Sequence, residues 1–356
     1  MRKLLRSIFC PERRNYGGYL PDSLVNAAID RTVDRTDKRL RALTGYRKRL
    51  REPVTKAVRH VIRIVGRLPA AIDLSPSNYG REPTLRAVFV STDHLRDTLG
   101  RLQTIRHYLD TAANPRPVEI FGLMTMSQHR HRVLGLELHG ETVVRDVLQT
   151  AVSFSNHRFI APATCEAQTR RELKIHAFDF LLETAVQRIG TERARLAGLV
   201  LQREQLRREI ETLNSKSSNP HGSSKPRADI RESMRLLRAE LQQIDTGLGR
   251  HPGAQLGLEE SLELVIGTLI NAPDLLAVTP VSDRLDYRGI KLSGRKAATA
   301  PPLRAFEFTS STGLKRIVFL ARIPQDALPP QIDVVKRGES FLGGCYGPIA
   351  RSMPTG

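Results

Sequence analysis

The sequence predicts an α+β protein in which a composite β-containing domain is interrupted by a long antiparallel coiled-coil helical hairpin and preceded by a basic N-terminal helical region. Two heptad-spaced apolar segments share one antiparallel register, and β-favouring segments lie on both sides of them. Basic residues cluster near the start of this chain of 356 residues, whose formal net charge is +19. Hydrophobic residues make up 40% but aromatic residues only 5%, so the core should consist mainly of Leu, Val, Ile and Ala.

These observations predict five regions along the chain. They are a basic helical region (1–72), a first part of the composite domain (84–162), the hairpin (164–272, with its tip at 215–226), a second part of the composite domain (274–336) and an irregular C-terminal tail (337–356).

The basic region predicts a helix from about Pro21 to Leu68, which Pro53 kinks or divides because it removes a backbone donor. Between positions 31 and 67, thirteen basic residues face three acidic ones, so this segment holds more than half of the net charge. The predicted nucleic-acid-binding residues are these thirteen: Arg31, Arg35, Lys38, Arg39, Arg41, Arg47, Lys48, Arg49, Arg51, Lys56, Arg59, Arg63 and Arg67.

The first part of the composite domain combines a helix with strands. Leu85 to Val90 favours a strand, and Ser91 or Thr92 is a suitable cap for a helix that continues to Leu109. Two further β-favouring runs, 118–126 and 133–139, predict a hairpin closed by a polar loop. The segment 143–154 fits a strand or a helix, and 159–162 closes this part.

The helical hairpin is the clearest local signal. Residues that face each other in two antiparallel helices have a constant index sum, and here the sum is 443 or 444 on both sides of the interruption at 247–253. Between the arms, residues 215–226 have the composition of a flexible tip. The predicted facing pairs are Leu213 with Ile230, Ile210 with Met234, Leu206 with Leu237, Arg203 with Leu241, Leu199 with Ile244, Leu196 with Leu248, Ala185 with Leu258, Leu182 with Leu262, Phe178 with Val265 and Ile175 with Leu269.

Arg203 is the one polar residue in this seam. We expect its aliphatic stem to pack along the seam while its guanidinium turns outward, and a role in specifying the register is the alternative. After the hairpin, four segments favour strands, and the last two flank a turn of Ser and Gly. These segments are 275–278, 287–292, 303–309 and 314–323.

No motif predicts a catalytic residue, a metal site or a cofactor. The phosphate-binding loop, the dinucleotide fingerprint and the common hydrolase motifs are missing from the sequence. His129 and His131, with His139 as a third ligand, could bind a metal from a predicted loop, but Arg130 and Arg132 would repel the cation. Three widely separated cysteines do not predict a disulfide framework, and the one near the start of the hairpin, Cys165, is expected to be a packing residue.

The leading functional hypothesis is a non-enzymatic interaction or scaffold protein that contacts RNA or DNA through its basic helix. The hairpin would contact a protein partner or a second copy of the chain. An enzyme or ligand sensor with a pocket in the composite β domain is one alternative, and a protein bound peripherally to anionic membranes is another. Without an apolar signal segment, a cytoplasmic location is expected.

Overall fold

The computed structural model describes residues 20–111, 117–139, 142–218, 227–249, 255–286, 288–292, 294–311 and 313–328. The chain forms two compact units and passes between them repeatedly. We call them the helical unit (Met1–Pro69, Glu166–Pro280 and Phe306–Val318) and the ribbon unit (Ala70–Cys165, Val281–Ala305 and Phe319–Gly356). Helices and antiparallel strands both contribute, so the α+β class predicted from the sequence is confirmed.

The helical unit begins with α2 (Asp22–Arg35), the short 3-10 helix η1 (Lys38–Ala42) and α3 (Tyr46–Gly66). Pro53 lies inside α3 and does not divide it, so this one of the two predicted effects, a kink or a division, does not occur. The predicted helix is divided earlier, where Asp37 caps η1 and Gly45 adopts a left-handed conformation with φ of 73°. Leu50, Val54 and Val61 are buried on one side of α3, which leaves the other side for charged residues.

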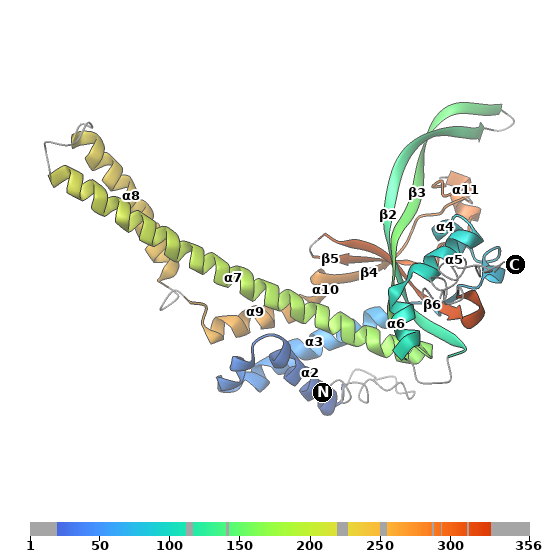
Figure 1. The fold of residues 1–356 in the computed structure, drawn as a ribbon, viewed down its shortest axis with the longest axis horizontal. Coiled ribbons are helices and arrows are strands. Elements are labelled where there is room, and N and C mark those ends of the chain that lie inside the picture. The colour runs from blue at the N-terminus through green and yellow to red at the C-terminus, as the bar shows by residue number, and fades with distance from the viewer. Residues whose placement is uncertain are drawn as a thin grey trace, which may run out of the picture. The chain divides into compact units, whose positions relative to one another are not determined.

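The long helix α7 (Glu166–Ser218) pairs first with α9 (Leu258–Ile270) and then with α8 (Arg227–Leu248), as Figure 1 shows. Leu196, Leu206, Ile244 and Leu248 form one buried cluster, against which Leu199, Leu237 and Leu241 pack. The burial of these residues agrees with the predicted facing pairs. Phe178, Leu182, Val265 and Leu269 are buried along the α7–α9 part of the seam in the same way.

The end of the Arg203 guanidinium reaches the surface, as predicted, but its Nε does not. Its Nη2 lies 3.8 Å from the Glu204 carboxylate at the surface, whereas its Nε is buried and has no hydrogen-bond partner among the described residues. The predicted tip lies partly within α7, which continues to Ser218, and residues 219–226 lie outside the described part of the chain.

Strands complete the helical unit. The short helix α10 (Ala272–Leu275) leads into β4 (Leu276–Pro280), which pairs antiparallel with β5 (Phe306–Ser310), and β5 pairs with the start of β6 (Lys315–Pro324). The predicted connection between the last two strands is confirmed by Gly313, whose φ is 78°.

In the ribbon unit, β6 continues and pairs with β1 (Ile72–Asp73) and β2, while β2 pairs with β3. The 3-10 helix η2 (Pro76–Asn78), α4 (Pro83–Val88), α5 (Thr92–Arg101) and α6 (Gln103–Thr111) precede these strands. The prediction of a strand at 85–90 is wrong, because Pro83 at the first helical turn and the Glu82 side chain, which accepts from Thr84 N, begin a helix there. Ser91 caps α5 as predicted.

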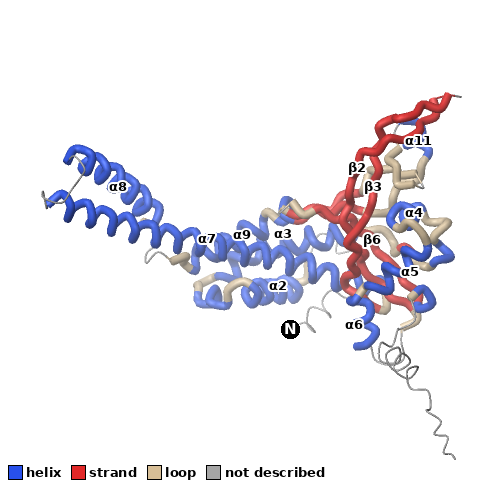
Figure 2. The backbone as a smooth tube through the Cα atoms, turned by 45° about the horizontal axis from the view of Figure 1, so that its top comes forward, coloured by secondary structure: helices blue, strands red, loops and turns tan. Residues whose placement is uncertain are grey.

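The largest difference from the sequence prediction is the β hairpin. Residues 118–126 and 133–139 do not form its two arms but belong to one strand, β2 (Glu119–His139), which pairs with β3 (Thr142–Ala163), as Figure 2 shows. The polar run between them, which suggested a loop, continues as strand. Its side chains remain accessible to water because the hairpin is a two-stranded ribbon there.

Bulges on β3 shift the register of this ribbon three times. Each shift coincides with one residue at positive φ, namely Asp146 at 58°, Asn156 at 54° and Ala161 at 55°. An extra residue on one strand bends it and increases its twist. We therefore attribute the curvature of β2 and β3 in Figure 1 to these three positions.

The remaining described parts of the ribbon unit are irregular. Ile290 bridges Ala151 at the edge of β3, α11 (Gly294–Thr299) follows, and the 3-10 helix η4 (Gln325–Ala327) succeeds β6. In residues 288–292, the described part of the predicted strand 287–292, only isolated bridges form. None of the described helices combines the length and apolar content of a membrane span.

Candidate nucleic-acid interface

Eight of the thirteen predicted basic residues form ion pairs, and Arg31 forms the most buried one. Its guanidinium donates two hydrogen bonds to Asp179 of α7, with Nε 2.5 Å from Oδ1. Both residues are less than 10% exposed, and Arg35 adds a contact of 3.3 Å to the same carboxylate. Arg31 therefore joins α2 to α7 and is not available to a polyanion.

Arg47 and Arg51, one turn apart on α3, point to α2. Arg47 pairs with Asp30 at 2.6 Å, and Arg51 pairs with Asp22 at 2.5 Å. Both arginines are about half exposed, so each pair contributes little to stability. Their charges are nevertheless largely compensated.

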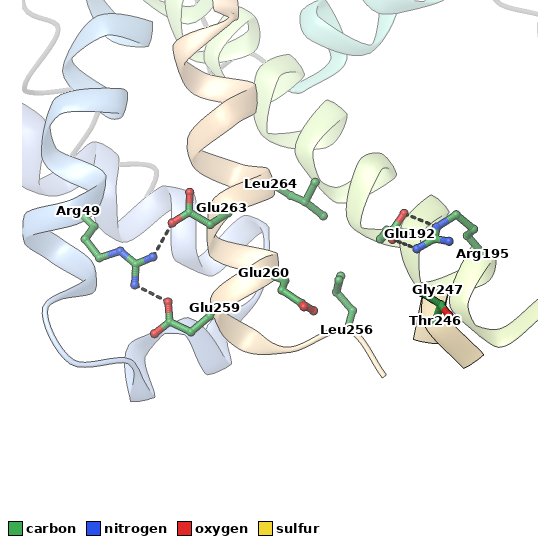
Figure 3. A pocket seen from close by; sticks show the side chains of 10 residues that line it. All are labelled: Arg49, Glu192, Arg195, Thr246, Gly247, Leu256, Glu259, Glu260, Glu263 and Leu264. Carbon is green, nitrogen blue, oxygen red and sulfur yellow. Dashed lines mark hydrogen bonds and ion pairs between the residues drawn. The ribbon is translucent and has the colours of Figure 1, made fainter. Parts of the chain in front are cut away.

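Arg49 points to α9, on a different side of α3. Figure 3 shows its guanidinium between Glu259 and Glu263, at 2.5 and 2.6 Å. This fork borders an open groove of about 880 Å³ in the helical unit. Glu192 and Arg195 of α7, which also line the groove, pair with each other at 2.6 Å. With Glu260, the lining has four carboxylates and two arginines, so the groove is net acidic and does not suit a polyanion.

Two further arginines are paired close to η1. Arg39 binds Asp37, whose carboxylate also meets Arg193 of α7 at 3.0 Å, and Arg41 binds Asp34 at 2.7 Å. The hydrogen bond from the Arg39 side chain is the main reason that the pKa of Asp37 falls to about 2. Asp37 is therefore ionised throughout the physiological range.

A second group of basic residues lies along one face of α3, and fewer acidic residues lie near it. Lys48, Lys56, Arg59, Arg63 and Arg67 recur every three to eight positions, so they share a stripe along the helix, and all five are exposed. Glu52 is the acidic residue of this stripe and pairs with Lys56 at 2.8 Å. We call these five residues the α3 stripe.

No ion pair is recorded for Lys48, Arg63 or Arg67 within the described part of the chain. Lys38, in η1, is exposed as well but lies outside α3. The structure thus separates the thirteen predicted residues into a majority whose charges are paired with acidic residues and a smaller group, which is the α3 stripe and Lys38.

The C-terminal end of α3 concentrates positive charge further. Arg170 of α7 donates to the carbonyl oxygens of Val65, Leu68 and Pro69, each at 2.9 Å, at the end of α3 and just beyond it. One turn along α7, burial and then the charges of Arg170 and Arg171 lower the pKa of Lys174. Cations gathered at this end complement the helix dipole and attract anions from solution.

Sequence reasoning found the basic residues but not their partners. Within the segment it counted the acids at 34, 37 and 52, whereas Asp179, Glu259 and Glu263 lie more than 140 positions away. The α3 stripe could have been recognised in the sequence, because its members recur at a spacing that places them on one face of a helix. Arg47 and Arg51 lie on another side of that helix.

The metal-site candidate His129 and His131 lies in β2 rather than in a loop. The rings stack with centroids 6.4 Å apart, and His129 Nε2 is 2.7 Å from the Ser155 hydroxyl across the ribbon. Within the described residues, no group of three or more His, Cys, Asp or Glu could hold a metal ion. Cys165, expected to pack inside, is exposed.

Comparison with protein-family models, curated proteins and solved structures gave no significant match. A functional proposal for this chain therefore rests on its own charges and geometry.

Proposed function

We propose that this protein is a non-enzymatic interaction protein whose α3 stripe binds RNA or DNA through the phosphate backbone. The observation that supports this most is the stripe itself: five exposed cations on one face of α3, a helix in which Glu52 is the acidic residue. This face therefore presents part of the net charge of +19 in an ordered and exposed array.

The stripe has the dimensions and chemistry for phosphate binding. From Lys48 to Arg67 the helix rises roughly 28 Å, and duplex DNA carries about one negative charge per 1.7 Å over that length. Lys and Arg that neutralise phosphates release condensed counterions, which favours binding at low salt. Such contacts fix the position of the protein but select no base sequence.

The α7–α8 hairpin supports the second half of the proposal, a protein partner. Leu201 of α7 and Leu236 of α8 are 72% and 63% exposed, on a helical pair whose other large apolar residues form the seam. We propose these two leucines as contact residues, because they are accessible to an apolar surface of a partner. Replacing both by Glu should weaken a partner that co-purifies with the full chain without changing its helix content, and unchanged co-purification would exclude these two contacts.

The nucleic-acid contact is tested by a salt series on the nuclease-treated full chain. The test variant replaces Lys48, Lys56, Arg63 and Arg67 by Gln, and the matched control replaces the exposed residues Arg208, Arg231, Arg235 and Arg238 of the helical hairpin by Gln. Both variants lose four charges, so the effect of net charge is the same.

If the stripe binds duplex DNA, the slope of log K against log salt should be lower by roughly three to four in the test variant, because each phosphate contact contributes about 0.9. The control should keep most of the wild-type slope. Equal slopes in the two variants would show that net charge alone accounts for binding, and no binding at about 50 mM salt would refute the proposal.

A further inference from the structure

One face of the β2–β3 ribbon is apolar and exposed. Leu134 lies directly opposite Leu148 in the register, and Leu136 follows two positions later on the same face of β2. These three leucines are 69%, 61% and 57% exposed, respectively. Single exposed leucines are common, but three adjacent ones on a two-stranded ribbon, which is itself marginally stable in water, are not.

The covered part of this face ends just before the leucines. On the same face, Arg130 reaches Asp283 at 2.7 Å, and Lys291 N donates to Thr150 O at the edge of β3. Thr150 is opposite Arg132, so the segment that covers the ribbon stops at this row. Farther along, none of the described residues shields the leucines to the extent seen in a core.

Charges of opposite sign lie on the two sides of the leucine pair. Arg132 is one step before it, at the covered end, and the bulge opposite Leu136, one step beyond it, contains Arg145 and Asp146. All three are exposed, and none has an ion pair among the described residues. The row order is therefore a cation, the apolar pair, then a leucine with an anion and a second cation.

We propose that this face binds a second copy of the chain. A two-fold axis through the Leu134–Leu148 row stacks the leucine pairs of the two copies on each other. Arg132 of one copy then lies over the row that holds Leu136 and Asp146 of the second copy, and the reverse contact forms by symmetry. The arginine stem covers the leucine while its guanidinium meets the carboxylate.

The size of the face predicts a weak, concentration-dependent dimer. About eight residues of each strand, at roughly 3.4 Å per residue, give a contact well below the ~1,600 Å² of a standard interface. Association should therefore appear in the micromolar range or above, and it should weaken in high salt because two ion pairs contribute. This inference does not depend on the proposed function.

The first experiment measures mass by sedimentation equilibrium of the full chain from about 1 to about 500 µM, the range for small interfaces. The double variant Leu134→Ser and Leu148→Ser should weaken association at least about tenfold. Leu314→Ser is the matched control, because that leucine is also exposed, at 47%, but lies just before β6, away from the ribbon face, and it should leave association unchanged.

The second experiment uses the symmetry of the contact. Arg132→Asp places two acids opposite each other twice in a homodimer, and Asp146→Lys places two bases opposite each other twice, so each variant alone should associate at least about tenfold more weakly. A mixture of the two variants forms a heterodimer in which both contacts are again opposite in charge, and it should recover association.

Because Asp146 has a φ of 58°, Asp146→Asn serves as the control that keeps a residue tolerant of that conformation while removing the charge. Asp146→Asn should weaken association, but less than Asp146→Lys does. A monomer at every concentration, or a dimer that none of the ribbon variants weakens, would overturn the proposal. Recovery in the mixture but in neither variant alone supports it, because no surface other than a two-fold contact between these positions predicts that result.

Discussion

The helix α7 and the strand β3 are both long, yet they depend on sequence in different ways. Along its 53 residues α7 packs against α9 and then α8, and its buried residues Leu182, Leu196 and Leu206 are among those that the heptad spacing placed in the seam. Over its 22 residues β3 changes its pairing with β2 three times, at Asp146, Asn156 and Ala161. A helix makes its backbone hydrogen bonds internally and needs only an apolar face for packing. A strand makes them with a partner strand, and a single bulge changes the register of that pairing.

The largest loss of stability is expected from breaking the buried ion pair between Arg31 and Asp179 of α7. Asp179→Ala removes the acceptor of Arg31 and leaves a guanidinium that is only 9% exposed. Losing one partner of a buried pair costs about 3 to 5 kcal/mol of the free energy of unfolding, measured by urea denaturation. Glu209→Ala, at an exposed position of the same helix, should cost less than about 0.5 kcal/mol. Equal stability of the two variants would mean that Arg31 finds water or another partner.

The seam of α7 should give the next largest effect. Leu196 is 1% exposed and packs in the cluster with Ile244 and Leu248. Leu196→Ala should lower the free energy of unfolding by about 2 to 4 kcal/mol, because it loses the transfer free energy of the buried atoms and leaves a cavity. Leu201→Ala, five positions later but 72% exposed, should change stability by less than about 0.5 kcal/mol. A similar cost at both positions would refute the single seam.

On β3, the expected effect depends on pH. His157 stacks on Phe89 at 5.2 Å and lies 6.0 Å from His94, and its buried Nε2 has no hydrogen-bond partner among the described residues. Burial, and then the nearby His94, lowers the pKa of His157 from 6.5 to about 4.

The unfolded chain therefore binds the proton first, and stability should fall as the pH drops from 6.5 towards 4. Because the ring is partly solvated, we expect a loss of about 1 to 2 kcal/mol rather than the full shift. His157→Phe keeps the stacking and should remove this part of the pH dependence in denaturation curves at about pH 7.5 and 4.5. Identical pH profiles for the variant and the wild type would contradict the assignment.

The smallest effect concerns the backbone of a bulge. Asn156 is exposed and has a φ of 54°, so replacing it changes conformational preference more than packing. Asn156→Ala should cost about 1 kcal/mol, because Ala adopts the left-handed region at a penalty, whereas Asn156→Gly should be nearly neutral. If Ala and Gly behave alike in thermal denaturation, this bulge does not require its left-handed residue.

Helical features proved the most predictable. The heptad seam, the cap at Ser91 and the interruption between α8 and α9 follow from residue spacing, because helix contacts recur every three to four positions. Strand features near Leu85 and at 127–132 were misassigned. A proline-initiated helix turn outweighed β propensity at the first site, and a polar run continued as ribbon at the second.

The sequence by itself determined the α+β class, the seam and the location of the basic segment, since these depend on local periodicity and composition. Only the tertiary structure decided which charges are exposed. Asp179, Glu259 and Glu263 reach Arg31 and Arg49 from helices distant in the chain, and nearby aspartates pair with Arg39, Arg41, Arg47 and Arg51. The α3 stripe remains outside these pairs. Charge compensation depends on distance in space and falls off within a few ångströms, so no count along the chain could have predicted it.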